Sequence, residues 1–205
     1  MLSAGAEPVN AKRVVWRYLL ALSGGSFAAL ALTAGALKLN PALPQEILIP
    51  MFWAREAFCA SLGIAGLLGI ARLARPGRPL GSVPVGIAVP VIAMWALAAS
   101  SLQAAPPPAR AHLIFGQTAA VCPFLIAMIA TPLFVALVWL LRGLAPTRLR
   151  LTGAAAGFAA GSLGALAYSL HCPELAAPFI GIWYLLGITI SATLGAWAGP
   201  RLLRW

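Results

Sequence analysis

The sequence predicts an all-α membrane protein in which six helices cross the bilayer. Of the 205 residues, 61% are apolar and only 9% are charged, whereas a soluble globular domain has roughly a quarter of its residues charged. The apolar residues extend along the whole chain and leave no polar stretch long enough for a separate soluble domain. We therefore expect residues 1–205 to form a single membrane domain.

Six stretches have the length and composition of a membrane span. A spanning helix needs about 20 mostly apolar residues. The stretches that meet this requirement are 18–37, 47–71, 83–104, 118–141, 151–170 and 175–199. Their apolar runs are continuous rather than alternating, which predicts helices and not the strands of a barrel.

The basic residues between these stretches predict the orientation of the chain. Eleven of the 14 Lys and Arg residues fall on one side of the expected bundle: Lys12, Arg13, Arg17, Arg72, Arg75, Arg78, Arg142, Arg148, Arg150, Arg201 and Arg204. The positive-inside rule then places residues 1–17 and the C-terminus in the cytoplasm. Topology explains the net charge of +10, so direct binding of nucleic acid is not expected.

The last two spans carry small residues at four-residue intervals. Gly153, Gly157 and Gly161 form one stripe, and Gly187, Ser191, Gly195 and Gly199 form the other. Residues four apart share a helix face, so each stripe allows close approach of another backbone. We expect the two spans to form an antiparallel hairpin around residues 171–177; the alternative use of a stripe is homodimerisation.

Prolines are expected to shape the third and fourth spans. Pro84, Pro90, Pro123 and Pro132 should interrupt these helices, because proline removes a backbone donor. The connection at 103–112 contains Pro106, Pro107 and Pro108 and predicts a stiff linker.

The inventory of reactive side chains is small and excludes most enzyme classes. The chain has three Cys, two His and four acidic residues, all of them Glu. A hydrolase triad, a glycosidase carboxylate pair and a zinc-protease motif are therefore excluded, and we expect neither an enzyme nor a resident cofactor. Ionisable residues in mid-membrane, typical of transporters, are missing from the last four spans, which leaves a small metal or anion transporter as a weak alternative.

Two cysteines precede prolines on the predicted extracytoplasmic side. Cys122 opens the fourth span and Cys172 lies in the sequence His171-Cys172-Pro173-Glu174. They could form a disulfide, which would close a loop of about 50 residues and add roughly 3–4 kcal/mol. Alternatively they could bind a soft metal ion transiently with His171 or Glu174, or they could simply pack as small apolar residues.

Three other residues are expected to have ordinary roles. Cys59 lies on an apolar span and should pack in the interior. Arg55 and Glu56 are adjacent and point about 100° apart on a helix, so we expect no simple pair between them and interpret both as reaching toward lipid headgroups; a role inside the bundle is the alternative. His112 should be exposed in its loop.

Several segments together resemble the NrsF-type family of six-helix membrane anti-sigma factors. They are MFWAR at 51–55, RLARPG at 72–77, Cys122, APTRLRL at 145–151, SLHCPE at 169–174, PFIGIWYLLG at 178–187 and GPRLLRW at 199–205. The similarity extends over nearly the whole chain and is densest after residue 120.

The resemblance implies a function. Members of the family hold an extracytoplasmic-function sigma factor at the bacterial inner membrane until a metal or oxidative stress releases it. The paired cysteines of the family match Cys122 and Cys172, which would make them the signal-sensing residues. Lys12, Arg13 and Arg148 are the candidate contacts with the sigma factor on the cytoplasmic side.

A membrane thiol-disulfide oxidoreductase using the same two cysteines is the main alternative. Such enzymes usually keep both thiols within reach of each other in a CxxC motif. The spacing between Cys122 and Cys172 departs from that pattern, so the sequence favours a sensor over a catalyst.

Overall fold

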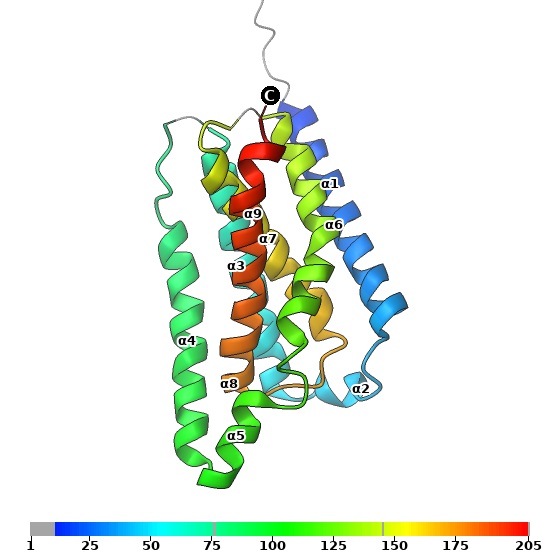
Figure 1. The fold of residues 1–205 in the computed structure, drawn as a ribbon, viewed down its shortest axis with the longest axis vertical. Coiled ribbons are helices and arrows are strands. Elements are labelled where there is room, and N and C mark those ends of the chain that lie inside the picture. Colours follow the sequence, from blue (N-terminus) through cyan, green and yellow to red (C-terminus); the bar gives the residue numbers. More distant parts are fainter. Residues whose placement is uncertain (1–10, 76, 145, 205) are drawn as a thin grey trace, which may run out of the picture.

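The computed structural model describes residues 11–75, 77–144 and 146–204, with the backbone alone for residues 11–14 (Figure 1). Within these residues the fold is entirely helical. The elements are α1 (Ala11–Leu32), the π-helix η1 (Thr33–Leu37), α2 (Leu43–Glu46), α3 (Pro50–Leu73), α4 (Val83–Ala104), α5 (Pro107–Phe115), α6 (Cys122–Arg142), α7 (Leu149–Ser169), α8 (Ala177–Phe179), the π-helix η2 (Ile180–Tyr184) and α9 (Leu185–Leu202).

Six helices are long and apolar enough to cross a membrane, which confirms the predicted number of spans. They cover Val15–Leu37, Pro50–Leu73, Val83–Ala104, Cys122–Arg142, Leu149–Ser169 and Ala177–Leu202. Each lies within a few residues of its predicted stretch. The chain is thus a multi-pass membrane protein by the length and composition of its helices.

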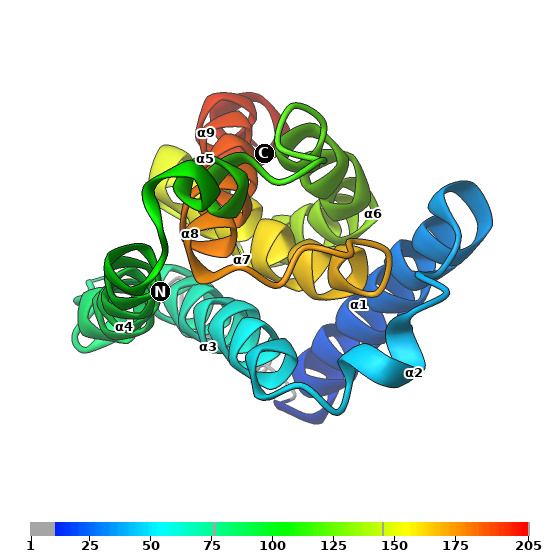
Figure 2. The ribbon, with the colours of Figure 1, turned by 90° about the horizontal axis from the view of Figure 1, so that it is seen from below.

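Helix α7 lies at the centre of the bundle, where it packs against α3, α6 and α9 (Figure 2). Its sequence consists largely of Ala and Gly with few bulky side chains, so neighbouring backbones can approach it from several sides. Helix α4 lies at the periphery, packs against α3 and α8, and leaves most of its side chains exposed. Four tryptophans near span ends, Trp16, Trp53, Trp139 and Trp197, are also exposed, as expected for an interfacial belt.

The hairpin of α7 and α9 confirms the prediction from the small-residue stripes. A Cβ atom built on Gly157 would contact the carbonyl oxygen of Ser191, and one on Gly195 would contact the carbonyl oxygen of Gly153. Both stripes are therefore used inside the chain, where they bring two helix backbones into direct contact.

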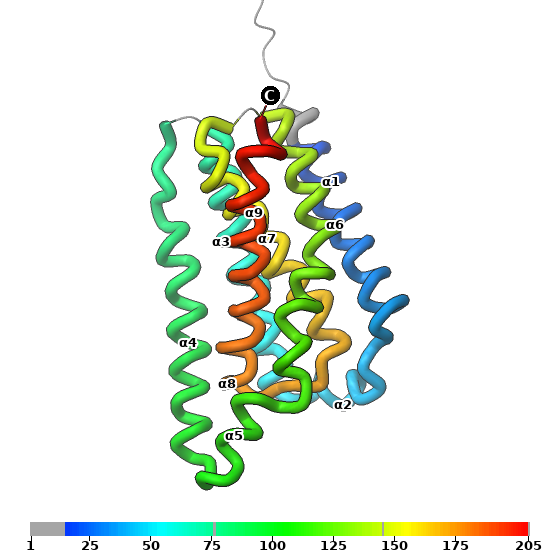
Figure 3. Tube along the Cα trace, in the orientation of Figure 1, coloured from blue at the N-terminus to red at the C-terminus, as the bar shows by residue number. Residues whose placement is uncertain are grey.

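The connections between the spans gather at two ends of the bundle (Figure 3). We call the end with the 38–49, 105–121 and 170–176 connections the cysteine end, because Cys122 and Cys172 lie there. We call the opposite end, where α1 begins and α9 ends, the arginine end. The first and last described residues, Ala11 and Arg204, lie at the arginine end.

Two expectations about proline were wrong in part. Pro84 and Pro123 lie in the first turns of α4 and α6, where the missing backbone donor has no intrahelical partner to lose; only Pro90 and Pro132 lie inside the helices. The 103–112 connection is not a stiff linker throughout, since Pro107 opens helix α5. The α5 helix is held by the Trp183 indole, which donates to the Ile114 carbonyl at 2.8 Å.

Candidate functional site

Cys122 and Cys172 are both buried at the cysteine end, and both are free cysteines. Cys122 begins α6, and its amide donates to the carbonyl of Thr118 at 2.9 Å. Cys172 lies in the turn after α7, and its sulfur is 3.8 Å from the hydroxyl oxygen of the same Thr118. Thr118 therefore contacts both cysteine residues, one through its backbone and the other through its side chain.

The surroundings of Cys172 favour its thiolate form. Hydrogen bonding with the Cys122 thiol lowers the pKa of Cys172 to about 6, and burial opposes this shift. The Glu174 backbone and the hydroxyls of Tyr184 and Thr118 lower the pKa further. A thiolate is the nucleophilic and metal-binding form of cysteine, so the lowered pKa increases the fraction of Cys172 in that form at neutral pH.

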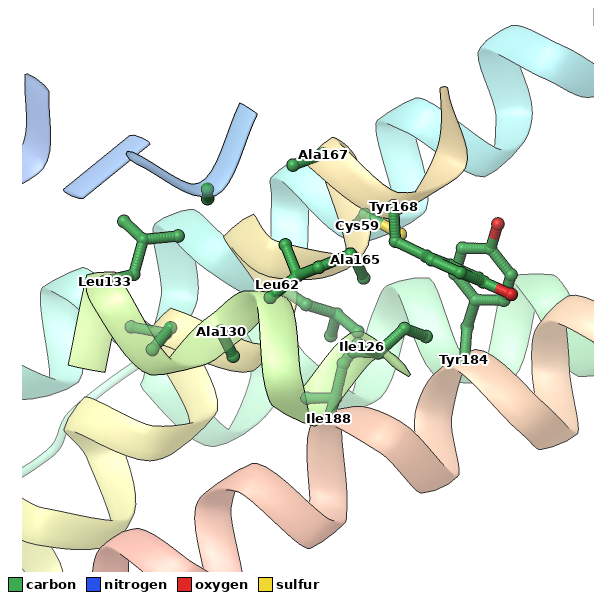
Figure 4. Close-up of a cluster of buried hydrophobic side chains, with 14 of the residues drawn as sticks. Cys59, Leu62, Ile126, Ala130, Leu133, Ala165, Ala167, Tyr168, Tyr184 and Ile188 are labelled. Carbon is green, nitrogen blue, oxygen red and sulfur yellow. The ribbon is translucent and has the colours of Figure 1, made fainter. Parts of the chain in front are cut away.

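Two tyrosines enclose the cysteines from α7 and η2. Tyr168 and Tyr184 are fully buried with ring centroids 5.8 Å apart, and they lie side by side in the core (Figure 4). Within the described part of the chain neither hydroxyl has a conventional hydrogen-bond partner. The Tyr184 hydroxyl lowers the pKa of Cys172, because a buried hydroxyl stabilises a nearby anion more than a neutral thiol.

Arg55 is the charged residue at the centre of this site. Its side chain is 0% exposed although it extends from a membrane helix. The guanidinium donates to the carbonyls of Ser169 and Cys172 at 3.0 Å and of Glu174 at 3.1 Å. The last carbonyls of a helix have no intrahelical partner, and the rigid fork of arginine supplies several donors at once. Arg55 therefore fixes the Cys172 turn to α3.

The expectation that Arg55 and Glu56 reach separately toward headgroups was wrong. Arg55 Nε lies 3.3 Å from Glu56 Oε1, and the Glu56 side chain is only 18% exposed. Adjacent side chains leave a helix about 100° apart, but the arginine side chain is long enough to turn toward the neighbouring carboxylate. The alternative role, inside the bundle, is the one the structure supports.

His171 and Glu174 point to different connections. The Nδ1 atom of His171 lies 2.9 Å from the carbonyl oxygen of Lys38, next to the end of η1. Glu174 Oε1 accepts a hydrogen bond of 2.7 Å from the Gln117 amide. Among the described residues, no group of three or more His, Cys, Asp or Glu side chains is close enough to hold a metal ion, so a metal site with these ligands stays a prediction.

Residues 169–174 thus join every connection at the cysteine end. They bind α3 through Arg55, the connection after η1 through His171, and the connection before α6 through Glu174. The backbone of Leu170 adds a bond by accepting from the Asn40 amide at 2.9 Å. A change in the covalent or metal-bound state of Cys172 would therefore act on several helices at once.

The candidate sigma-contacting residues belong to the opposite end. The side chains of Lys12 and Arg13 lie outside the described residues. Arg148 is exposed immediately before α7, where its carbonyl accepts from the Thr152 amide. Of the residues with ordinary expected roles, Cys59 is fully buried, as predicted. His112 is exposed, as predicted, but it lies in helix α5 and not in a loop.

Sequence reasoning missed Tyr168 and Tyr184 and misjudged Arg55. An arginine inside an apolar span marks a functional position, and that signal was present in the sequence. For the tyrosines no local pattern existed, since their proximity to Cys172 depends on the packing of α7 against η2 and α9.

Comparison with known proteins places the chain in a family. The model of the family described as "Negative regulator of sigma F" (NrsF) matches residues 2–205. A protein of Azospira oryzae named "Probable anti-sigma-F factor NrsF" is 45% identical over 205 residues, covering 100% of this chain and 96% of the relative. "Anti-sigma-F factor NrsF" of Caulobacter vibrioides is 38% identical over 207 residues, covering 98% and 92%.

No solved structure matches the chain. The family is regulatory by its description, which agrees with the prediction that the protein is not an enzyme. A match over nearly the full length, together with six membrane-length helices, shows that this chain belongs to the NrsF family of negative regulators of sigma F.

Proposed function

We propose that the protein is a membrane-bound anti-sigma factor that sequesters a sigma factor of the extracytoplasmic-function class. The observation that carries this proposal is similarity over the full length to two proteins named as anti-sigma-F factors. Sequestration at a membrane removes the sigma factor from RNA polymerase without any reaction, and the chain offers no machinery of hydrolysis.

The arginine end faces the cytoplasm in this proposal. It carries the exposed arginines of the connections other than Arg110, whereas the three described glutamates, Glu46, Glu56 and Glu174, lie at the cysteine end. An excess of Lys and Arg on one side is the signal that orients membrane helices. Both termini then lie in the cytoplasm, and the protein resides in the inner membrane of a bacterium.

The sigma factor binds at the arginine end. The surface available there consists of the residues 1–17 segment and the short connections between spans. Lys12, Arg13 and Arg148 are proposed contacts, because basic side chains complement acidic patches on a partner and steer its association.

Cys122 and Cys172 sense the signal at the opposite end. Both are thiols in the resting state. A two-electron oxidant such as a peroxide would accept two electrons while the two thiols lose their protons and one S–S bond forms. A soft divalent cation would instead displace both thiol protons and bind the two sulfurs.

The response passes through the residues 169–174. If His171 or Glu174 completes a metal site, it must leave its present bond to Lys38 or Gln117, which loosens the connections next to α1 and α6. If a disulfide forms, Cys172 moves toward α6 and pulls on α3 through Arg55. Packed helices shift between discrete arrangements, so a small movement at one end can alter the opposite end.

Disulfide formation and metal binding can each supply the free energy that release of the sigma factor requires. To change the sigma factor from 99% bound to 99% released, the signal must favour the released state by about 5.5 kcal/mol. Formation of a disulfide or of a metal site with two thiolates is of that order, whereas a single hydrogen bond contributes about 1 kcal/mol.

Copurification tests the proposal. The protein, tagged after Trp205, is isolated from its own bacterium in mild detergent, and bound proteins are identified by mass spectrometry. We expect a sigma factor in the untreated sample and its loss after treatment of the cells with an oxidant or cadmium. Turnover of a dithiol substrate, with no sigma factor bound, would instead support the thiol-disulfide oxidoreductase.

A further inference from the structure

A cavity at the arginine end is lined by three arginines. It has a volume of about 600 Å³ and is bordered by Arg150 from the first turn of α7, by Arg201 from the last turn of α9 and by Arg204, two residues after that helix. The remaining lining residues are Thr193, Ala196, Trp197 and Pro200, all on α9. The two helices stay in backbone contact up to this end, where a Cβ atom built on Gly199 would contact the Leu149 carbonyl. The cavity therefore lies beside their contact and has a basic rim.

The described residues place no carboxylate beside this cavity. The described glutamates lie at the cysteine end, so within the described residues no carboxylate is near the three arginines. Arg201 is held in place by the Trp197 ring, whose centroid is 4.7 Å from the guanidinium carbon. An arginine stacked on an aromatic ring loses less conformational freedom when its donors bind an anion.

The wall of the cavity continues into the apolar part of the span. Thr193 lies eight residues before Arg201, which is about 12 Å along the helix axis. Trp197 lies between them and is 68% exposed, in the position of an interfacial aromatic residue. A ligand that fills this space must therefore be anionic at one end and apolar along the next 12 Å or so.

An anionic phospholipid has this combination of properties. Its phosphate accepts bidentate hydrogen bonds from arginine, and its acyl chain can lie against Ala196 and Trp197. An acidic protein segment would match the arginines alone, because a soluble partner remains outside the bilayer and does not reach Thr193. We propose that this cavity is a binding site for one anionic phospholipid, held by Arg150, Arg201 and Arg204 with its acyl chain along α9.

Native mass spectrometry in a neutral detergent tests the site directly. The full-length protein is titrated with phosphatidylglycerol, and separately with phosphatidylcholine as a lipid without net charge. We expect one phosphatidylglycerol molecule to bind tightly to each protein, and phosphatidylcholine to bind without comparable affinity. Each of R150Q and R201Q should weaken binding about fivefold, the factor for one basic residue beside an anionic membrane lipid.

A matched control separates the site from general basic charge. Arg78 is exposed at the same end but does not border the cavity, so R78Q should leave the affinity for phosphatidylglycerol unchanged. Equal loss in R78Q and R201Q, or equal binding of both lipids, would overturn the proposal. Competition by inorganic phosphate as strong as by the lipid would also overturn it, because the acyl chain would then contribute nothing.

A second measurement locates the acyl chain. Phosphatidylglycerol with brominated acyl chains quenches nearby tryptophan fluorescence, and we expect W197F to lose a large part of that quenching. Trp16 is exposed but does not border the cavity, so the control variant W16F should keep most of the quenching. Quenching unchanged in W197F would contradict the placement along α9.

Discussion

Arg55 and Cys172 are separated by 117 positions in the sequence, yet the guanidinium of Arg55 donates to the carbonyl of Cys172 at 3.0 Å, and both residues are completely buried. The bond fixes the turn that carries a reactive thiol to a different membrane helix. A buried charge is costly unless its hydrogen bonds are satisfied, so the Arg55 guanidinium must keep its bonds to these carbonyls. The position of Cys172 therefore depends on α3, the helix that carries Arg55.

Substitution of Arg55 should destabilise the protein. In R55Q, Glu56 loses its buried ionic partner and the carbonyls of Ser169, Cys172 and Glu174 lose their shared donor. We expect a loss of about 3–5 kcal/mol, the cost of removing one member of a buried pair. Thermal unfolding in detergent measures this, with R110Q as the control, because Arg110 is exposed at the same end.

R55K separates the charge of Arg55 from its geometry. Lysine keeps the positive charge but lacks the planar fork that reaches several carbonyls at once. We expect its melting temperature to lie between those of the wild type and R55Q. Equal melting temperatures for R55Q and R110Q would show that the buried arginine does not hold the turn.

Close packing of α7 on α9 predicts a second effect on stability. The substitution G157A places a methyl group against the Ser191 carbonyl and the Ala192 backbone. Overpacking of this kind costs about 1–3 kcal/mol. The control is G24A in α1, where nothing lies within 4 Å of the new Cβ atom, and where alanine should be neutral or slightly favourable. If both variants melt alike, the α7–α9 contact is not tight.

The ionisation of Cys172 should depend on pH in a specific manner. Because its pKa is lowered to about 6, the thiolate forms as pH rises through 6 and is almost complete by pH 7.5. The thiol is buried, so its thiolate is followed without a reagent, as the difference in ultraviolet absorbance between the wild type and C172S. This difference should rise through that interval and then level off, whereas the thiolate of an ordinary cysteine forms only around pH 8.5.

The hydroxyl of Tyr184 contributes to this pH dependence. In Y184F the Cys172 thiolate loses the stabilising effect of that hydroxyl, so the midpoint of the absorbance change should move to higher pH. A thiolate absorbance that still increases between pH 7.5 and 9 in the wild type would contradict a stabilised thiolate.

The helical part of the fold could be predicted because lipid imposes simple rules. Continuous apolar runs determined the six spans, and the glycine stripes of α7 and α9 determined their pairing, since both signals are local in the sequence. Helix α5 was missed because three prolines in a row indicate extended chain. Their tolerance in a first helical turn depends on which residue begins the helix.

The candidate site was only partly predictable. The two Cys-Pro sequences identified the thiols, but the environment of Cys172 consists of residues from α3, α7 and η2 that come together only through packing. Arg55 illustrates the limit: its sequence neighbours suggest an interfacial residue, and only the orphan carbonyls at the end of α7 explain why the side chain turns inward.

We propose that thiol chemistry at the cysteine end controls retention of a sigma factor at the arginine end. The most direct test compares wild-type, C122S and C59S membranes for bound sigma factor before and after treatment with peroxide or cadmium; C59S is the matched control, because Cys59 is buried outside the pair. We expect equal binding in all three untreated samples, release from wild type and C59S on treatment, and retention by C122S. Release from C122S on treatment, or its failure to hold the sigma factor at rest, would contradict it.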